Sequence, residues 1–299
     1  MSRIFMKYAV LGFVLLAATG AAGAERLKQV TAVYLDDKGG ALAAPEGIVC
    51  DAKGGIVVAD TGNGRLLKYS FKDAGISGGS EVKAPQLTVP TRLQLDSKGD
   101  IYALDGKLRR IAHLKGDGSF VGYLDLHGVP APDPQIRSFR VGANDQVYLL
   151  DILGRRVLEL DPSGNFQRQL PFPAEAGFCS DLALTRGGDL LLLDSLASVV
   201  YAASKGGIEF KPLSKDLKEY VSFATYLTTD SRGTIFVMDQ NGSSLVTLGP
   251  DGTYTGRLLA LGWKEGQLYY PAQICVSDGG LLGIADRNNS RAQFFELIK

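Results

Sequence analysis

The chain has 299 residues and carries 32 Lys and Arg against 32 Asp and Glu, so its formal net charge at pH 7 is zero. This balance argues against a nucleic-acid-binding protein, which would need an excess of basic residues on one surface. The length fits a single domain if the architecture is repetitive, because such folds run beyond the usual domain size.

Residues 1–24 have the composition of a signal peptide. Arg3 and Lys7 precede an apolar run, and Ala22, Gly23 and Ala24 provide small residues for cleavage. The run is shorter than the ~20 apolar residues that span a bilayer as a helix, and an uncleaved membrane anchor is the alternative. We therefore expect cleavage after Ala24 and a periplasmic or secreted mature chain, residues 25–299, without a transmembrane segment.

A repeat of 43 to 47 residues organises the rest of the chain. Its clearest marker is an Asp that ends an apolar run, at Asp60, Asp105, Asp151, Asp194, Asp239 and Asp286. The sixteen residues that end at each Asp align without a gap. Six copies at this period indicate a propeller or a solenoid.

Each copy predicts strand, turn and strand, followed by two further strands. The turn has Gly at one shared position in five copies and Asp145 in the third, residue types that tolerate a positive φ. The second strand is apolar without alternation, as in IVVA and LLLL, so both of its faces must be covered. Four strands per repeat, stacked face to face around an axis, are typical of a β-propeller.

The run PEGIVCDAKGGIVVADTGNGR, residues 45–65, resembles an NHL repeat, and residues 266–295 are similar to another. The resemblance implies an all-β fold: a six-bladed propeller of four-stranded antiparallel blades that forms a single domain over residues 25–299. The strand expected within residues 26–35 belongs to no repeat. We expect it to join the last blade and close the ring, which would hide two exposed strand edges.

The six repeat Asp residues are interpreted as structural rather than as a metal cluster, the role that the NHL resemblance implies for them. An Arg stands five residues after four of them, and each pair is expected to hold its own turn. The pairs are Asp60 with Arg65, Asp105 with Arg110, Asp151 with Arg156 and Asp286 with Arg291. Val199 and Ser244 occupy the Arg position in copies four and five.

The three cysteines predict at least one free thiol in an exported chain, because their number is odd. Cys50 and Cys275 fall in predicted first strands, where we expect small buried apolar residues. No cofactor is predicted, and no metal-ligand spacing is found among the cysteines. The only two histidines, His113 and His127, are not expected to form a zinc site.

The first strand of each blade should line the central channel, and its polar residues form the candidate site. At the channel mouth we expect Glu46, Arg92, Arg137, Asp181, Tyr226 and Gln273. They either pair with one another and water in an open funnel, or form a pocket for an anionic or carbohydrate-like ligand. In the second case Arg92 and Arg137 would be bidentate donors. Trp263, in the loop before the last repeat, is a candidate partner contact on the rim.

We therefore predict an exported, non-enzymatic binding scaffold, with no catalytic residue assigned. Its rim and channel mouth would hold another envelope protein or a small polar ligand, and not nucleic acid. The alternative is a metal-dependent hydrolase or lyase of the lactonase-like propeller class, with Glu46 and Asp181 as metal ligands.

Overall fold

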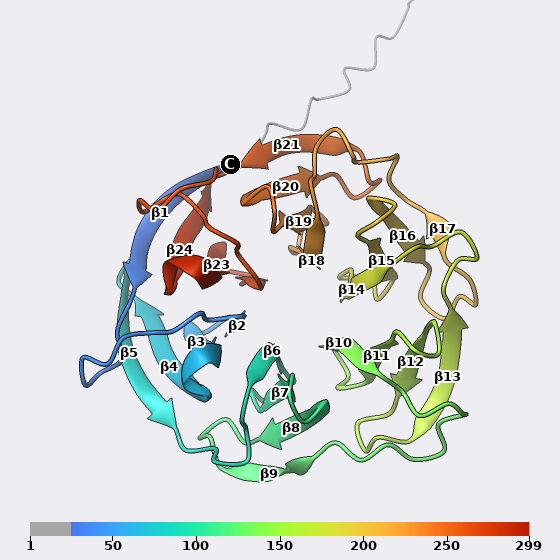
Figure 1. Cartoon of the computed structure of the whole chain (residues 1–299), viewed down its shortest axis with the longest axis horizontal. Coiled ribbons are helices and arrows are strands. Elements are labelled where there is room, and N and C mark those ends of the chain that lie inside the picture. Colours follow the sequence, from blue (N-terminus) through green and yellow to red (C-terminus); the bar gives the residue numbers. More distant parts are fainter. Residues whose placement is uncertain (1–24, 299) are drawn as a thin grey trace, which may run out of the picture.

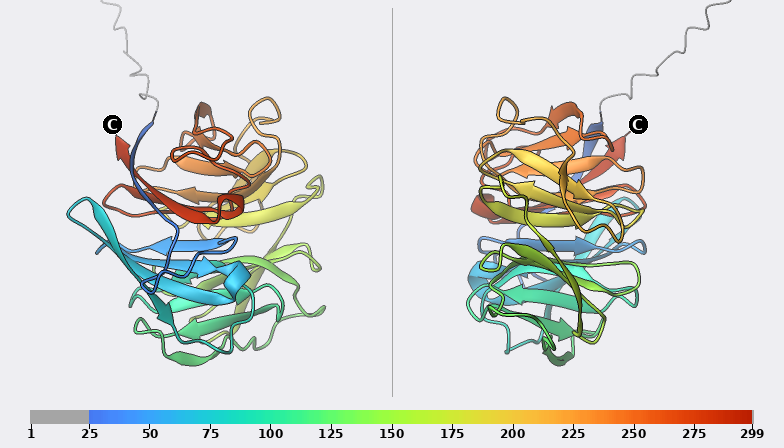
Figure 2. Two further views of the ribbon diagram at one scale, coloured as in Figure 1. Left: turned by 60° about the vertical axis from the view of Figure 1, so that its left-hand side comes forward. Right: turned by 90° about the vertical axis from the view of Figure 1, so that its right-hand side faces the viewer.

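The structure, a computed structural model, describes residues 25–298 and is a six-bladed β-propeller (Figure 1). Six four-stranded antiparallel sheets surround a central axis, and the side views show them stacked around it (Figure 2). The predicted fold class is confirmed. The predicted signal peptide, residues 1–24, lies outside the described residues. Within those residues, no helix is long and apolar enough to cross a membrane.

Blades one to three follow one another along the chain, each from its inner strand to its outer strand. Blade one consists of β2 (Gly47–Cys50), β3 (Gly55–Asp60), β4 (Arg65–Lys72) and β5 (Gly75–Val82). Blade two consists of β6 (Pro90–Leu95), β7 (Ile101–Asp105), β8 (Arg110–Leu114) and β9 (Phe120–Tyr123). Blade three consists of β10 (Ile136–Val141), β11 (Val147–Asp151), β12 (Arg156–Leu160) and β13 (Phe166–Pro171).

Blades four and five repeat this order, and blade six takes its outer strand from the other end of the described chain. Blade four consists of β14 (Cys179–Leu184), β15 (Leu190–Asp194), β16 (Val199–Ala203) and β17 (Lys211–Pro212). Blade five consists of β18 (Ala224–Thr229), β19 (Ile235–Asp239), β20 (Ser244–Leu248) and β21 (Tyr254–Leu258). Blade six consists of β22 (Ile274–Val276), β23 (Leu281–Asp286), β24 (Arg291–Ile298) and β1 (Arg26–Val33). Short 3-10 helices, Thr61–Asn63 and Arg287–Asn289, follow β3 and β23.

The ring closes as predicted, through antiparallel pairing of β1 with β24 (Figure 1). The register runs from Arg26 opposite Ile298 to Val33 opposite Ala292. Each strand thereby covers an edge of the other, which would otherwise offer unpaired N–H and C=O groups to another chain.

The core lies between neighbouring blades rather than at one centre. One cluster joins Leu150 and Val157 of blade three to Leu182 and Leu192 of blade four, and all four are fully buried. The second strand of each blade is therefore covered on both faces, which explains its continuous apolar sequence. The shared turn residue has a positive φ in every blade, including Asp145 at 64° in blade three.

The cysteines differ from the prediction in one respect. Cys50 on β2 and Cys275 on β22 are not simple buried apolar residues but form a disulfide, with their Cα atoms 5.8 Å apart. Adjacent inner strands of blades one and six bring them together, although 225 residues separate them in sequence. Cys179 is buried and free, so the predicted free thiol is present.

Candidate functional site

The six repeat Asp residues organise the loops on one face of the ring. Each side chain is fully buried and accepts hydrogen bonds from backbone N–H groups of the loop that leads into the inner strand of its blade. Asp194 shows the pattern: Gly177 and Phe178 of the lead-in loop donate to it at 2.6 and 3.1 Å, and Leu196 and Ala197 of its own turn donate at 3.0 Å. The lead-in donors are Ala43, Thr88 and Val89, Gln135, Gly177 and Phe178, Ser222 and Phe223, and Tyr269. We call this the capped face.

Three of the expected Asp–Arg contacts are present as close ion pairs. The Arg Nε donates to the carboxylate at 2.8 Å in Asp60–Arg65, 2.9 Å in Asp151–Arg156 and 2.7 Å in Asp286–Arg291. Each of these Arg residues also reaches beyond its own turn. Arg291, for example, donates to the carbonyl oxygens of Trp263, Lys264 and Gln267 in the lead-in loop of blade six.

The fourth expected pair, Asp105 with Arg110, is not among the ion pairs of the described residues, and this prediction was wrong. The Arg110 guanidinium lies 3.9 Å from the ring centroid of Tyr123 and 3.5 Å from a carboxylate oxygen of Asp125. The oxygens of Asp105 already accept hydrogen bonds from the Thr88 side chain and from four backbone N–H groups. Burial alone would raise the pKa of Asp105, but the hydrogen bonds from Leu108, Thr88 and Val89 outweigh it and lower the pKa.

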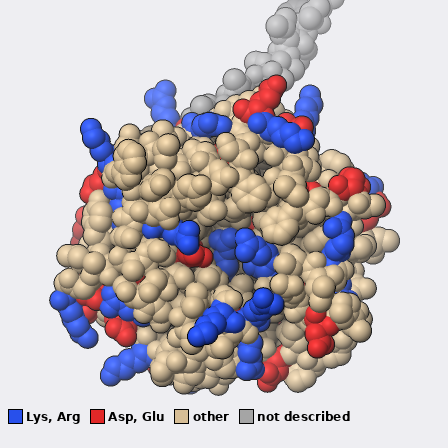
Figure 3. Space-filling model, viewed as in Figure 1, with Lys and Arg blue, Asp and Glu red and all other residues tan. Residues whose placement is uncertain are grey.

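The capped face contains a funnel of about 400 Å³ at the axis of the ring. The residues that matter most for its chemistry are Glu46, Arg92, Arg109, Arg137, Thr225 and Arg287. In the space-filling view, basic side chains gather around the central opening on this face (Figure 3). Glu46 forms an ion pair with Arg287 at 2.9 Å, so one of the funnel's arginines is neutralised by it.

Arg92 and Arg137 lie in the funnel without a carboxylate partner among the described residues. Arg92 is nearly buried and donates one hydrogen bond, at 3.3 Å, to the carbonyl oxygen of Thr225. Loss of solvation lowers the pKa of Arg137, and repulsion from Arg92 lowers it further. The charges of Asp181 and Glu46 act in the opposite direction, and Arg137 itself is an exposed residue, so Arg92 is the more dehydrated of the two.

Thr225 lines the funnel, but its hydroxyl is enclosed by the protein. Its residue is 4% exposed, and its Oγ1 has no hydrogen-bond partner among the described residues. A buried hydroxyl without a partner costs free energy.

Asp181, Tyr226 and Gln273, expected at the mouth, instead form a buried layer below it. Tyr226 is 2% exposed, between the guanidinium groups of Arg92 and Arg140 at 5.0 and 4.6 Å from its ring centroid. Asp181 accepts hydrogen bonds from the Ser138 hydroxyl, from Arg140 at 3.0 Å and from the Leu227 N–H at 2.9 Å.

Gln273 completes this buried layer across the axis. Its side chain binds both backbone groups of Leu93 on blade two, accepting from the N–H at 3.1 Å and donating to the carbonyl at 2.8 Å. A smaller cavity of about 240 Å³, lined by Tyr226, Gln273 and both disulfide cysteines, lies on the other side of the layer. The channel is thus divided, and only its capped end carries the arginine funnel.

The two groups of predicted residues come from alternate positions of the inner strands. Glu46, Arg137 and Thr225 share one position of the sixteen-residue alignment, whereas Asp181 and Gln273 share the next. Successive residues of a strand point to opposite faces, so one set meets the funnel and the other fills the axis. Arg92 belongs to the second set, but its long side chain also reaches the funnel. Thr225 is a funnel residue that the sequence reasoning did not select, although the alignment identifies its position.

Trp263 lies on the rim of the capped face. Its side chain is 73% exposed, and its ring centroid is 6.0 Å from that of Tyr269. Asn289, beside the Asp286 turn, donates to the Gly262 carbonyl oxygen at 3.0 Å and ties this loop to the face.

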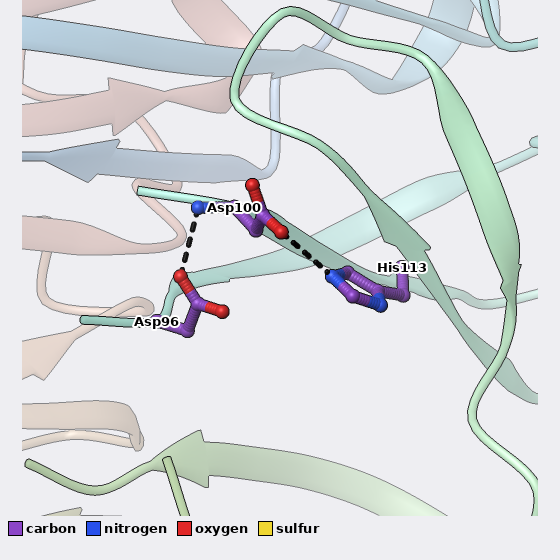
Figure 4. A group of neighbouring side chains, drawn as sticks. All are labelled: Asp96, Asp100 and His113. Atoms are coloured by element: carbon purple, nitrogen blue, oxygen red, sulfur yellow. Dashed lines mark hydrogen bonds and ion pairs between the residues drawn. The ribbon is translucent and has the colours of Figure 1, made fainter. Parts of the chain in front are cut away.

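Asp96, Asp100 and His113 form the one group of possible metal ligands found in the described part of the chain (Figure 4). The Asp100 carboxylate lies 3.2 Å from His113 Nε2 and accepts a hydrogen bond from the Gly116 N–H at 2.8 Å. Asp96 accepts from the Asp100 N–H at 2.8 Å. This group lies at the end of β6 away from Arg92, on the opposite face, and its hydrogen bonds order two turns.

Comparison with known proteins supports the fold and leaves the activity open. The family model described as NHL repeat matches residues 42–69. No curated protein matches the chain.

Similar solved structures have different activities. A virginiamycin B lyase from Staphylococcus aureus is 15% identical, with a TM-score of 0.64 over 91% of this chain and 100% of that one. A gluconolactonase from Xanthomonas campestris is 12% identical, with a TM-score of 0.67 over 92% and 90%. A PQQ-bound aldose sugar dehydrogenase from Streptomyces coelicolor is 14% identical, with a TM-score of 0.66 over 93% and 100%. At these identities the likeness concerns the fold alone.

Proposed function

We propose that this six-bladed propeller is a non-enzymatic binding scaffold that captures an anionic ligand in the arginine funnel of its capped face. The observation that carries the proposal is the pair Arg92 and Arg137, which line one cavity without a carboxylate partner in the described structure. The two guanidinium groups repel one another and Arg92 is nearly buried, so an anion between them would relieve an unfavourable arrangement. The planar donors of Arg suit a carboxylate or phosphate group.

The alternative, a metal-dependent hydrolase or lyase, is less well supported by the geometry of the residues it requires. That hypothesis needs Glu46 and Asp181 as ligands of one ion. Asp181 is fully buried, and both of its carboxylate oxygens accept hydrogen bonds from protein groups. Glu46 forms its ion pair with Arg287 above that layer. The two carboxylates therefore serve separate structural roles.

The proposal extends to where the protein works. The predicted signal peptide would place the mature chain in the periplasm or outside the cell. N-terminal sequencing of the protein from its host, together with cell fractionation, would test this part.

Calorimetric titration of the mature chain with citrate and gluconate tests the funnel, with glucose as the uncharged comparison. We expect the anions to bind, glucose not to bind, and the affinity to fall as salt is added. Arg137→Glu should weaken binding roughly tenfold or more, since a hydrogen bond to a charged group contributes about 1.5–3 kcal/mol. Arg26→Glu, an exposed change on β1 outside the funnel, is the matched control. Equal affinities for both variants would contradict the proposed site.

A further inference from the structure

Exposed apolar side chains collect on the same face as the funnel. Three leucines occupy the turn after the second strand in three adjacent blades: Leu108 is 41% exposed, Leu153 59% and Leu196 62%. The corresponding turns of blades one, five and six have the sequences TGN, QNG and RNN. The leucines therefore form a one-sided arc over blades two to four, which we call the leucine arc.

The leucine arc adjoins the funnel directly. Leu108 is next in sequence to Arg109, and Leu153 is next to Ile152, both of which line the funnel. Across the ring, the lead-in loop of blade six exposes Leu261, Trp263 and Tyr270. Six of the eleven exposed large apolar residues in the described chain thus lie on this one face.

The combination of positive charge and apolar surface indicates what kind of ligand the capped face could bind. A small anion held in a cavity of about 400 Å³ would satisfy the arginines but would leave the leucine arc in water. A ligand that satisfies both must be extended, with negative charge in its middle and apolar groups beside it. Building on the proposed anion site, we propose that the capped face binds an acidic segment of a partner protein that is flanked by apolar side chains.

The shape of the site favours a polypeptide over a membrane surface. Arg92 is nearly buried at the bottom of the funnel, where a narrow chain can reach it and a flat layer of headgroups cannot.

Fluorescence anisotropy with a labelled synthetic peptide tests the inference. The probe carries two adjacent glutamates flanked by leucines; two comparison peptides replace the glutamates by glutamine or the leucines by serine. We expect the probe to bind the mature chain and both comparison peptides to bind at least several-fold more weakly. The double variant Leu153→Ser/Leu196→Ser should weaken probe binding roughly tenfold, because two apolar side chains lose their burial, yet leave citrate binding unchanged. Ile208→Ser, at a residue 82% exposed in a loop of blade four, is the matched control and should change neither.

The outcomes separate this inference from the function on which it rests. If the leucine double variant binds the probe as tightly as the wild type while Arg137→Glu does not, the funnel binds anions but the partner inference is wrong. If Arg137→Glu changes neither citrate nor probe binding, both proposals are wrong. Phosphatidylglycerol vesicles that bind through the leucines, with no binding of the probe, would overturn the inference in favour of a membrane surface.

Discussion

At the scale of single residues, the repeat Asp of each blade supplies a hydrogen-bond acceptor for backbone N–H groups of the neighbouring loops. The capped face brings two loops of each blade together, and their N–H groups would be buried without partners. Asp194 and Asp239 show that backbone donors suffice, because blades four and five have Val199 and Ser244 where other blades have Arg. The Arg in blades one, three and six then adds contacts to carbonyl and carboxylate groups of the surrounding loops.

Asp194→Ala should therefore be strongly destabilising. It removes the acceptor of the N–H groups of Gly177, Phe178, Leu196 and Ala197, and a hydrogen bond to a charged group contributes about 1.5–3 kcal/mol. We expect the free energy of unfolding to fall by at least about 3 kcal/mol, measured by denaturant titration. Asp161→Ala, at a solvent-exposed turn, is the control and should cost about 1 kcal/mol or less. Similar losses in both variants would contradict the capping role.

Asp105 should make the free energy of unfolding depend on pH. Its pKa in the folded protein is lowered, so its contribution is present above the unfolded pKa of about 4 and is lost as the pH falls through the folded pKa. We expect Asp105→Asn to be less stable than the wild type at pH 7. The difference between the two should shrink as the pH falls below about 4. Thermal unfolding at a series of pH values measures this, and a difference that stays constant with pH would argue against it.

At the scale of elements, the inner strands carry two layers of different chemistry. Residues at one position meet the funnel, and their immediate neighbours fill the axis with hydrogen-bonded groups such as Asp181 and Gln273. A strand turns successive side chains to opposite faces, so a shift of one position changes a ligand-facing residue into a core residue. Substitutions of Asp181 therefore report on stability, whereas those of Arg137 report on binding.

At the scale of the whole molecule, two connections close the ring where blade six meets blade one, which we call the seam. The pairing of β1 with β24 completes blade six, and the Cys50–Cys275 disulfide joins the inner strands of the two blades. The seam thus connects residues from both ends of the described chain. A cross-link over so long a loop stabilises mainly by restricting the unfolded chain.

The double variant Cys50→Ser/Cys275→Ser should lower the free energy of unfolding by about 2–4 kcal/mol. Adding reductant to the wild type should produce a similar loss, and adding it to the double variant should produce none. The free thiol gives an independent check: burial raises the pKa of Cys179 to about 12. Thiol reagent at pH 8 should therefore modify no cysteine in the folded protein and one in the unfolded, unreduced chain. Three reactive thiols without reductant would contradict the disulfide.

The two faces of the ring differ although the net charge of the chain is zero. The capped face gathers Arg92 and Arg137, which form no ion pair with the described residues, and six of the eleven exposed large apolar residues of that part of the chain. The opposite face carries the tight turns between first and second strands, such as the one that holds Asp96 and Asp100. This asymmetry makes the capped face the part of the molecule suited to a ligand.

The repeat determined the architecture without help from the structure. A period of 43 to 47 residues, a second strand apolar on both faces and a spare strand before the first repeat allow few other arrangements. These are local signals, because most strand pairs lie within one repeat and the apolar clusters join neighbouring blades. The spacing of Asp and Arg also indicated the ion pairs of blades one, three and six.

Only the tertiary structure decided which polar residues face a ligand. Arg140 lies two residues after Ser138 on β10, yet it reaches Asp181 of blade four and Leu227 of blade five across the axis. The Cys50–Cys275 disulfide and the place of Arg137 in the funnel likewise depend on strands from different blades. The physical reason is that the inner strands of all six blades, which are distant in sequence, surround the axis. Which charges are paired there depends on side-chain reach and ring closure, whereas the blade itself depends on short-range pattern.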